Sequence, residues 1–244
     1  MRILRTSCGM EIRWHDLVGS TNDEARLWAE QGAAEGSVVC ADEQSAGRGR
    51  RGAVWICPAG QALAFSQILR PGMPRALWPR LALVIGLAVA KTLEMHGLAA
   101  EVKWPNDVWV AGKKIAGLLL ESSGDVVIAG VGLNVNVTEF PQEIAGIATS
   151  MRRETGIEYD REDLLVGVAR SILSHSRRAE SEFSDLLAEW RERCALSGKR
   201  VSLLLGNEVH IARVHGIGER GELLIERNGG IEALLQADQI RPLE

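Results

Sequence analysis

A loop in which glycine and arginine alternate is the segment of the sequence with the clearest chemical potential. It runs Gly47-Arg48-Gly49-Arg50-Arg51-Gly52 and is followed by Trp55. Glycine lets backbone N–H groups approach an anion closely, and the planar guanidinium of arginine binds carboxylate and phosphate oxygens. The loop therefore suits an anion clamp. A solvated basic loop or a nucleic-acid-binding patch explains these residues equally well when they are taken alone.

A second polar group comes from Lys103-Trp104-Pro105-Asn106-Asp107 and from Lys113-Lys114-Ile115-Ala116-Gly117 on the following strand. Proline after a bulky residue favours an extended backbone, which brings the amide of Asn106 and the carboxylate of Asp107 to a strand edge. There they could position Mg²⁺ or ribose oxygens. Lys114 could hold a positive charge at a fixed point. The alternative is a hairpin with two solvated lysines, in which Gly117 serves only close packing.

Three further segments carry weaker signals. Gly130-Val131-Gly132-Leu133-Asn134 ends an apolar run, and its glycines could admit a ligand that Asn134 hydrogen-bonds. Its spacing is not that of a dinucleotide fingerprint, and a β-bulge explains it equally well. Ser20-Thr21-Asn22 is typical of a helix cap, and Gln44 alone indicates nothing.

These residues must be positioned by a mixture of strands and helices. Ser20 and Thr21 offer capping hydroxyls, and Asp23 and Glu24 favour the first turn of a helix that continues to about Gln31. A second helix over 79–95 is apolar on nearly every face, and helical periodicity returns from 161 to about 194. Strand-like runs cover 38–40, 62–69, 102–104, 108–110, 115–120 and 126–131. They predict a mixed sheet made largely of hairpins.

The last part of the chain differs from the rest. Short β-rich runs over 200–243 are separated by turn signals at 206–207, 216–221 and 228–230, which fits a small antiparallel barrel. Ser197-Gly198 interrupts the preceding helical pattern. We therefore expect two domains, covering residues 1–196 and 197–244.

Composition narrows the class of protein. The 28 Lys and Arg against 32 Asp and Glu give a net charge of −4, which makes nucleic acid a poor default partner. The longest apolar run, around 81–90, has about half of the roughly 20 residues that a membrane-spanning helix needs. The first residues do not resemble a secretory signal, so we expect a cytoplasmic protein. Its scattered cysteines, with no metal-ligand spacing, predict reduced thiols: Cys8, Cys40, Cys57 and Cys194.

Taken in order, these segments resemble the motif series of biotin protein ligases. The resemblance extends from about Trp14 to the C-terminus, and the glycine-arginine loop followed by Lys-Trp-Pro-Asn-Asp is its most specific feature. It implies an α+β catalytic domain of the class II aminoacyl-tRNA synthetase type, with a mixed sheet and flanking helices. It also implies a C-terminal SH3-like β-barrel. Without it, composition and periodicity lead only to an anion-binding α/β domain.

The resemblance also implies a role for each matching residue. Lys114 would be the central catalytic cation, assisted by Arg48 and Arg50. Biotin would be bound by Ser20, Thr21, Asn22, Gln44, Arg48, Gly49, Arg50, Lys114 and Gly117. ATP would be bound by Arg50, Arg51, Trp55, Asn106, Asp107 and Asn134, and Mg²⁺ by Asn106 and Asp107.

The implied enzyme uses biotin and ATP with Mg²⁺ as substrates and holds no tightly bound prosthetic group. It forms biotinyl-5′-AMP and pyrophosphate, and then biotinylates a lysine of a biotin carboxyl carrier domain. The family often has a basic residue after the loop, where this chain has Ala53 and Val54, which bears on loop closure and dimer contact. Only about a dozen residues precede the motifs, so we expect a monofunctional form without the DNA-binding domain of some members. A homodimer is one possible assembly.

Three other functions compete with this interpretation. A lipoate or octanoate ligase shares the general fold, but the Arg-Arg-x-Ser-Gly-Gly-Gly signature of that branch is absent. A regulator that binds biotin or nucleotide without turnover is opposed by the presence of Lys114, Asn106 and Asp107. A nucleic-acid-binding module that uses the arginine loop is opposed by the acidic net charge.

Overall fold

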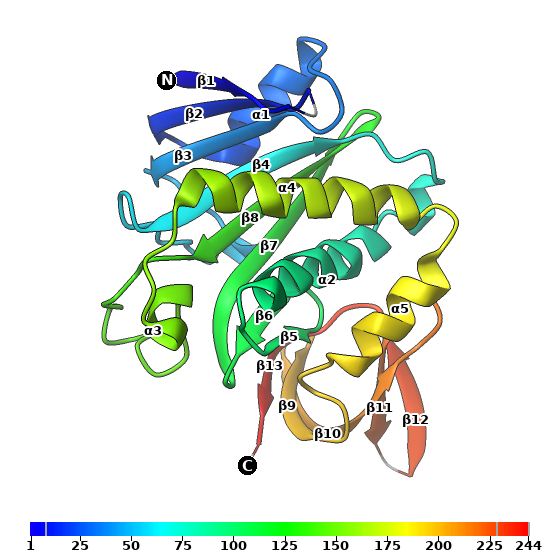
Figure 1. Cartoon of the computed structure of the whole chain (residues 1–244). Coiled ribbons are helices and arrows are strands. Elements are labelled where there is room, and N and C mark those ends of the chain that lie inside the picture. The colour runs from blue at the N-terminus through cyan, green and yellow to red at the C-terminus, as the bar shows by residue number, and fades with distance from the viewer. Residues whose placement is uncertain (8, 228, 244) are drawn as a thin grey trace.

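A computed structural model describes residues 1–7, 9–227 and 229–243 and shows two β-sheets with helices packed on the larger one (Figure 1). Cys40, Cys57 and Cys194 are free thiols, as predicted, and burial raises the pKa of Cys57 to about 11. Cys8, and Asn228 of a predicted turn, lie outside the described residues. No helix in the described part of the chain is long and apolar enough to cross a membrane.

The large sheet is mixed, as predicted. Neighbouring strands pair antiparallel except β2 and β3, which are parallel. The hairpins β5–β6, β6–β7 and β7–β8 account for one side of it. In spatial order its strands are β1 (Arg2–Arg5), β2 (Glu11–Val18), β3 (Val38–Gln44), β4 (Ala62–Leu69), β8 (Val126–Asn134), β7 (Lys113–Ser123), β6 (Asp107–Val110) and β5 (Ala100–Lys103).

Helices cover both faces of this sheet. Helix α1 (Thr21–Glu30) connects the parallel strands β2 and β3, and its apolar side packs on Val39, Ile68 and Ile128. The opposite face carries α2 (Arg80–Met95) and α4 (Arg161–Arg178), which lie in front of the sheet in Figure 1, and α5 (Phe183–Glu192) packs beside α2. The predicted apolar helix is therefore central to the core. Each fully buried leucine contributes about 1.5–3 kcal/mol by leaving water.

Short helical segments complete the catalytic part: η1 (Arg50–Gly52), η2 (Arg75–Leu77) and α3 (Met151–Thr155). Helix α1 begins where the sequence predicts and has Asp23 and Glu24 in its first turn. The predicted side-chain cap is wrong, because the hydroxyl of Ser20 makes no capping hydrogen bond. The polar side chains of this turn make other contacts, described below.

The C-terminal strands form a separate five-stranded antiparallel sheet. Its order is β12 (Gly230–Leu234), β11 (Leu223–Arg227), β10 (Glu208–Ile217), β9 (Arg200–Leu205) and β13 (Asp238–Pro242). Among the described residues β12 and β13 are not paired, so the expected barrel is not closed. The domain boundary near Ser197 stays a prediction, since one hydrophobic cluster includes Leu87 and Val214 from both parts.

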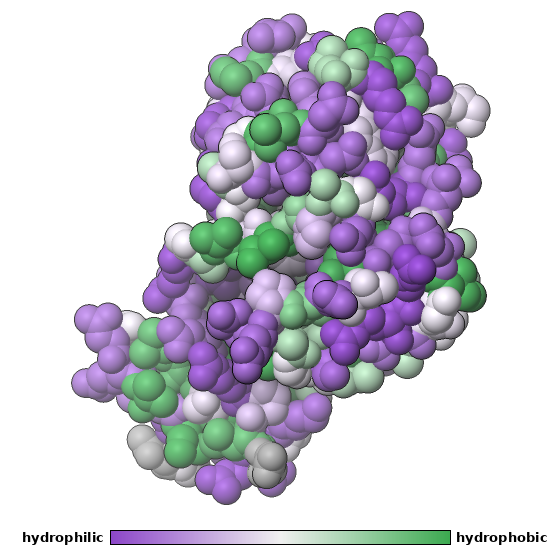
Figure 2. Space-filling model, turned by 90° about the vertical axis from the view of Figure 1, so that its left-hand side faces the viewer, coloured by the Kyte–Doolittle hydropathy of each residue, from purple (hydrophilic) through white to green (hydrophobic). Residues whose placement is uncertain are grey.

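Hydrophilic side chains predominate on the molecular face shown in Figure 2. Hydrophobic side chains gather there in small groups, including one at the lower end, where the C-terminal sheet lies in Figure 1. That sheet exposes Val209, Ile211 and Ile231. Apolar atoms contribute much of the accessible surface of folded proteins, so these exposed residues need no special explanation.

Candidate active site

A cavity of about 550 Å³ lies where the first turn of α1, the glycine-arginine loop and the strands β6, β7 and β8 meet. This volume falls within the usual range for small-molecule sites. All the site residues predicted from the sequence line it except Asn134. The folding of the chain thus brings together distant segments, such as Thr21 and Leu118, which are 97 positions apart. Residues of the C-terminal sheet, among them Asp238, also line it.

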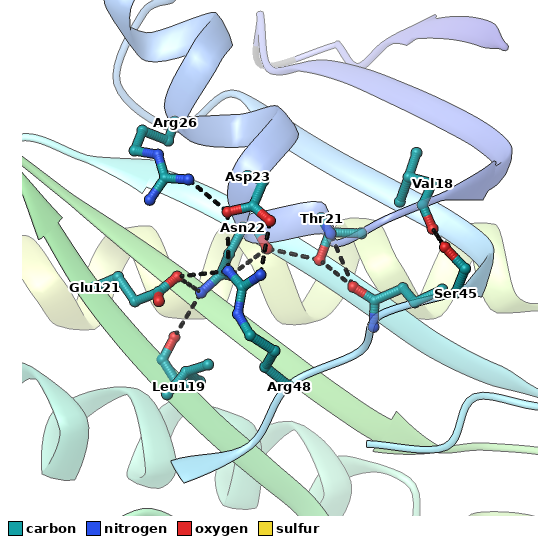
Figure 3. A network of polar contacts seen from close by, with 11 residues as sticks. Val18, Thr21, Asn22, Asp23, Arg26, Ser45, Arg48, Leu119 and Glu121 are labelled. Atoms are coloured by element: carbon teal, nitrogen blue, oxygen red, sulfur yellow. Dashed lines mark hydrogen bonds and ion pairs between the residues drawn. The ribbon is translucent and has the colours of Figure 1, made fainter. Parts of the chain in front are cut away.

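The first turn of α1 meets the end of β3 through a polar network (Figure 3). Gln44 Oε1 accepts hydrogen bonds from the backbone N–H of Thr21 at 2.8 Å and from its hydroxyl at 3.1 Å. The hydroxyl of Ser66, buried on β4, lies 2.7 Å from Thr21 Oγ1 and 2.6 Å from Asn22 Oδ1. Asn22 Nδ2 donates to Glu121 at 2.7 Å. These contacts fix the polar groups before any ligand arrives.

Arg48 is held beside this network by two carboxylates (Figure 3). Its guanidinium donates to both oxygens of Asp23, at 2.7 and 2.9 Å, and lies 3.5 Å from Glu121. The hydrogen bond from Arg48 lowers the pKa of Asp23 and raises the pKa of Arg48 itself. Arg48 is therefore a fixed, permanently charged group at the cavity edge.

A glycine surface on β7 and β8 forms the floor of the cavity. Gly117 and Gly132 are paired across the two strands, and the Trp55 indole lies directly over them. A Cβ on Gly132 would lie 2.1 Å from Trp55 Cε2. A Cβ on Gly130 would lie 2.3 Å from Asn22 Oδ1. Close packing of these side chains therefore requires glycine, and the β-bulge that could also explain the Gly130–Asn134 segment is absent, because its pairing with β7 is regular.

Lys114 reaches this floor because β7 bulges. Val108 pairs with Ala116 and Trp109 pairs with Lys114, so β7 has one extra residue at this point. Bulges redirect side chains, and the Lys114 ammonium lies 2.8 Å from where a Cβ on Gly117 would be. Its Nζ pairs with Asp107 Oδ1 at 2.7 Å. The lysine is thus a positioned cation and not one of two solvated lysines.

The other loop arginines contact Asn106 and the C-terminal sheet. Arg50 Nη1 donates to Asn106 Oδ1 at 3.4 Å, and Asn106 Nδ2 donates to the Leu118 carbonyl at 2.6 Å. Arg50 and Arg51 both form ion pairs with Asp238 at the start of β13. The sequence patterns gave no sign of Asp238, because a single acid in a short strand is indistinguishable from a solvated one.

Asn134 lies at an adjoining cavity of about 210 Å³, which shares Trp55 and Lys114 with the first. Its walls are mostly apolar and include Phe140, Pro141, Ile144, Ile147 and Ala148. The Asn134 amide donates to the Thr149 carbonyl at 3.0 Å, so part of its hydrogen-bonding capacity is already used. This cavity suits a flat apolar group with a polar edge.

Lys103 is a cavity-lining cation that the sequence placed in a motif but did not assign to the site. Burial lowers its pKa, while nearby Asp107 opposes that shift. Its ammonium lies 4.5 Å from the centroid of the Trp109 ring. Ser66 and Glu121 are likewise newly found contributors. For Ser66, the only available signal was the polar pair Ser66-Gln67 within the apolar run 62–69.

These contacts define a class of protein: an enzyme that holds a carboxylate- or phosphate-bearing ligand between a glycine floor and a ring of cations. Acyl or phosphoryl transfer at such a site gains from fixed charge and alignment of the reactants. No cluster of three or more His, Cys, Asp or Glu side chains suited to a metal lies among the described residues. Asn106 and Asp107 are adjacent oxygen donors of the kind that Mg²⁺ prefers, and in this structure they pair with Arg50 and Lys114.

Comparison with known proteins narrows this class. The sequence model of the Biotin/lipoate A/B protein ligase family matches residues 14–137, about half of the chain. The chain is 34% identical to Bifunctional ligase/repressor BirA of Bacillus subtilis, with 94% of this chain and 74% of that protein covered. It is 33% identical to the Biotin--[acetyl-CoA-carboxylase] ligase of Paracoccus denitrificans, with 90% and 95% covered.

A solved structure gives the same result. The biotin protein ligase from Aquifex aeolicus in complex with biotin and ATP superposes with a TM-score of 0.86 at 32% identity. The superposition covers 95% of this chain and 99% of that one. The chain therefore belongs to the biotin/lipoate A/B protein ligase family, as its motif series predicts.

Proposed function

We propose that this chain is a biotin protein ligase that activates biotin with ATP and transfers it to a lysine of a carrier domain. The observation that carries the proposal is the position of Lys114. Its ammonium lies on the glycine floor, within ion-pair distance of Asp107, in a cavity that the arginine loop also lines. A carboxylate and an α-phosphate brought to this point would share one fixed cation. The similarity to ligases of known substrate supports biotin as the acid.

Biotin fits the cavity with its two ends in different surroundings. The ureido ring, a neutral group with donors and acceptors, would lie against Thr21, Asn22 and Gln44 at the start of α1. Ser20, buried at the same turn, would complete that end. The acyl chain would pack on Trp55 above the glycines, and its carboxylate would meet Lys114. Arg48 and Gly49 would close the loop over it.

ATP fits the remaining cations and the adjoining apolar cavity. The adenine would stack in the cavity bounded by Trp55, Phe140 and Ile144, with the Asn134 amide at its edge. Arg50, Arg51 and Lys103 would face the phosphates. Asn106 and Asp107 would hold Mg²⁺, which neutralises phosphate charge when it is bound.

The protein then contributes mainly by aligning the reactants and by placing positive charges near them, and it forms no covalent bond to the substrate. A biotin carboxylate oxygen bonds to the α-phosphorus of ATP, and the bond to the bridging oxygen breaks as pyrophosphate leaves. The acceptor amine next attacks the acyl carbon, loses a proton, and displaces AMP. Lys114 and the loop arginines stabilise the negative charge that develops on the phosphate oxygens. The closed loop keeps water from the mixed anhydride.

The first experiment compares acids in a pyrophosphate-release assay with purified protein and ATP. The proposal predicts release that depends on biotin, with lipoate and octanoate giving little. Release with lipoate or octanoate alone would assign the chain to the other branch of its family. Binding of biotin without any release would instead favour a non-catalytic regulator, and binding of oligonucleotides with a steep salt dependence would favour a nucleic-acid module.

The carrier domain of a biotin-dependent carboxylase is the proposed acceptor, and the cytoplasm is the proposed location. A homodimer is also compatible with the family. We propose that the open C-terminal sheet is the counterpart of the SH3-like barrel that the family resemblance implies.

A further inference from the structure

Asp238 connects the C-terminal sheet to the proposed active site. It is the first residue of β13, it lines the main cavity, and its side chain is only 10% exposed. The adjacent Gln239 has a positive φ of 47°, an unusual backbone conformation for a residue with a side chain. A carboxylate with so little exposure gains from a cationic partner.

Its partners are two arginines of the glycine-arginine loop. Arg51 forms a short ion pair with one carboxylate oxygen of Asp238, and Arg50 lies 3.5 Å from the other. Arg51 has φ 53° and ψ 38°, so the tip of the loop is itself in the left-handed region. Arg48 is bound separately by Asp23, across the cavity. The loop is therefore attached at two points, to helix α1 and to the C-terminal sheet.

An exposed ion pair usually contributes little to stability, and Arg51 is 56% exposed. Asp238 differs because its side chain is only 10% exposed and forms ion pairs with two arginines at once. A guanidinium has five N–H donors, so Arg50 and Arg51 can keep the carboxylate and still donate to a phosphate. The contact with Asp238 therefore holds the loop across the cavity without preventing ligand binding.

We infer that Asp238 is a positioning residue that keeps the arginine loop closed over the acyl-adenylate until the acceptor amine attacks. The inference rests on the proposed function, because it assumes that a reactive adenylate forms beneath the loop. The C-terminal sheet would then take part in the reaction, because it supplies one of the two attachment points of the arginine loop. Loss of this anchor would let the adenylate escape into solution.

The test compares Asp238→Asn with Glu222→Gln. Glu222 directly precedes β11 of the same sheet, its side chain is 9% exposed and pairs with Arg220, but it does not line the main cavity. After one turnover with biotin and ATP, free and protein-bound adenylate are separated by rapid filtration. Released adenylate also reacts with lysines of other proteins, so biotinylation of an added, unrelated protein is a second measure of its release. We expect Asp238→Asn to release adenylate roughly tenfold faster, the effect of losing one charge-assisted hydrogen bond, and Asp238→Glu to restore most of the retention.

Retention by Asp238→Asn equal to that of the wild type and of Glu222→Gln would overturn the inference. A second measurement needs no catalysis: trypsin should cut after Arg50 or Arg51 several-fold faster in folded Asp238→Asn than in either reference protein. Unchanged cleavage would also overturn it. Absence of adenylate in the wild type would instead contradict the proposed function, while the proteolysis result would still decide whether Asp238 anchors the loop.

Discussion

Replacement of Lys114 by alanine gives the sharpest test of the charge arrangement. An ammonium about 3 Å from a developing phosphate charge contributes about 5 kcal/mol at an effective dielectric constant of about 20. Asp107, 2.7 Å from the ammonium, and the 35% exposure of the side chain offset part of this attraction. If about 3 kcal/mol remains, adenylate formation should slow by roughly 10²-fold.

The assay is single-turnover adenylate formation at saturating biotin and ATP, with circular dichroism and thermal unfolding as checks of the fold. Lys113→Ala is the matched control, because Lys113 is the adjacent lysine on β7 and does not line the main cavity. It should keep nearly full activity. An unchanged rate in folded Lys114→Ala, or an equal loss in Lys113→Ala, would refute the assignment of Lys114 as the fixed cation.

Three further outcomes follow from the geometry. Gly132→Ala should displace the Trp55 indole, whose Cε2 would lie 2.1 Å from the new Cβ, and weaken biotin binding at least tenfold in calorimetry. If Asn22 binds biotin as proposed, Glu121→Gln should raise the KM for biotin several-fold with little change in the KM for ATP, because the Glu121 carboxylate accepts the hydrogen bond that orients the Asn22 amide. Asp23 has a pKa below its unfolded value, so its bond to Arg48 stabilises the fold above about pH 4 and is lost as the pH falls through the lower, folded-state pKa. Urea unfolding of Asp23→Asn should therefore show a weaker loss of stability between pH 5 and about pH 3 than the wild type.

Local patterns in the sequence were sufficient to predict most strands of the large sheet and most of its helices. The strand over 62–69 and the helix predicted over 79–95, observed as Arg80–Met95, were found because elements buried on nearly every face are rich in hydrophobic residues. Strands β1 and β2 and the short helix α3 were not identified, since their mixed polarity and short lengths leave no distinct period. The failed Ser20 cap has another origin: a capping propensity does not by itself establish the hydrogen bond.

The candidate site was predicted through its motifs, and the structure adds the reasons for their spacing. The bulge that turns Lys114 towards Gly117 depends on pairing with β6, which no single segment encodes. Asp238 and Phe140 were missed because their importance arises only when distant parts of the chain meet at the cavities. Long-range contacts of this kind are set by tertiary packing and not by local sequence.

The most direct test of the ligase assignment follows one turnover to its end by intact mass spectrometry. Protein, biotin and ATP are mixed, excess small molecules are removed, and a carrier domain is added. The assignment predicts that the carrier gains the mass of one biotinyl group on one lysine, and that omission of either biotin or ATP prevents the gain. Adenylate formation with no gain in carrier mass, or an equal gain without ATP, would contradict it.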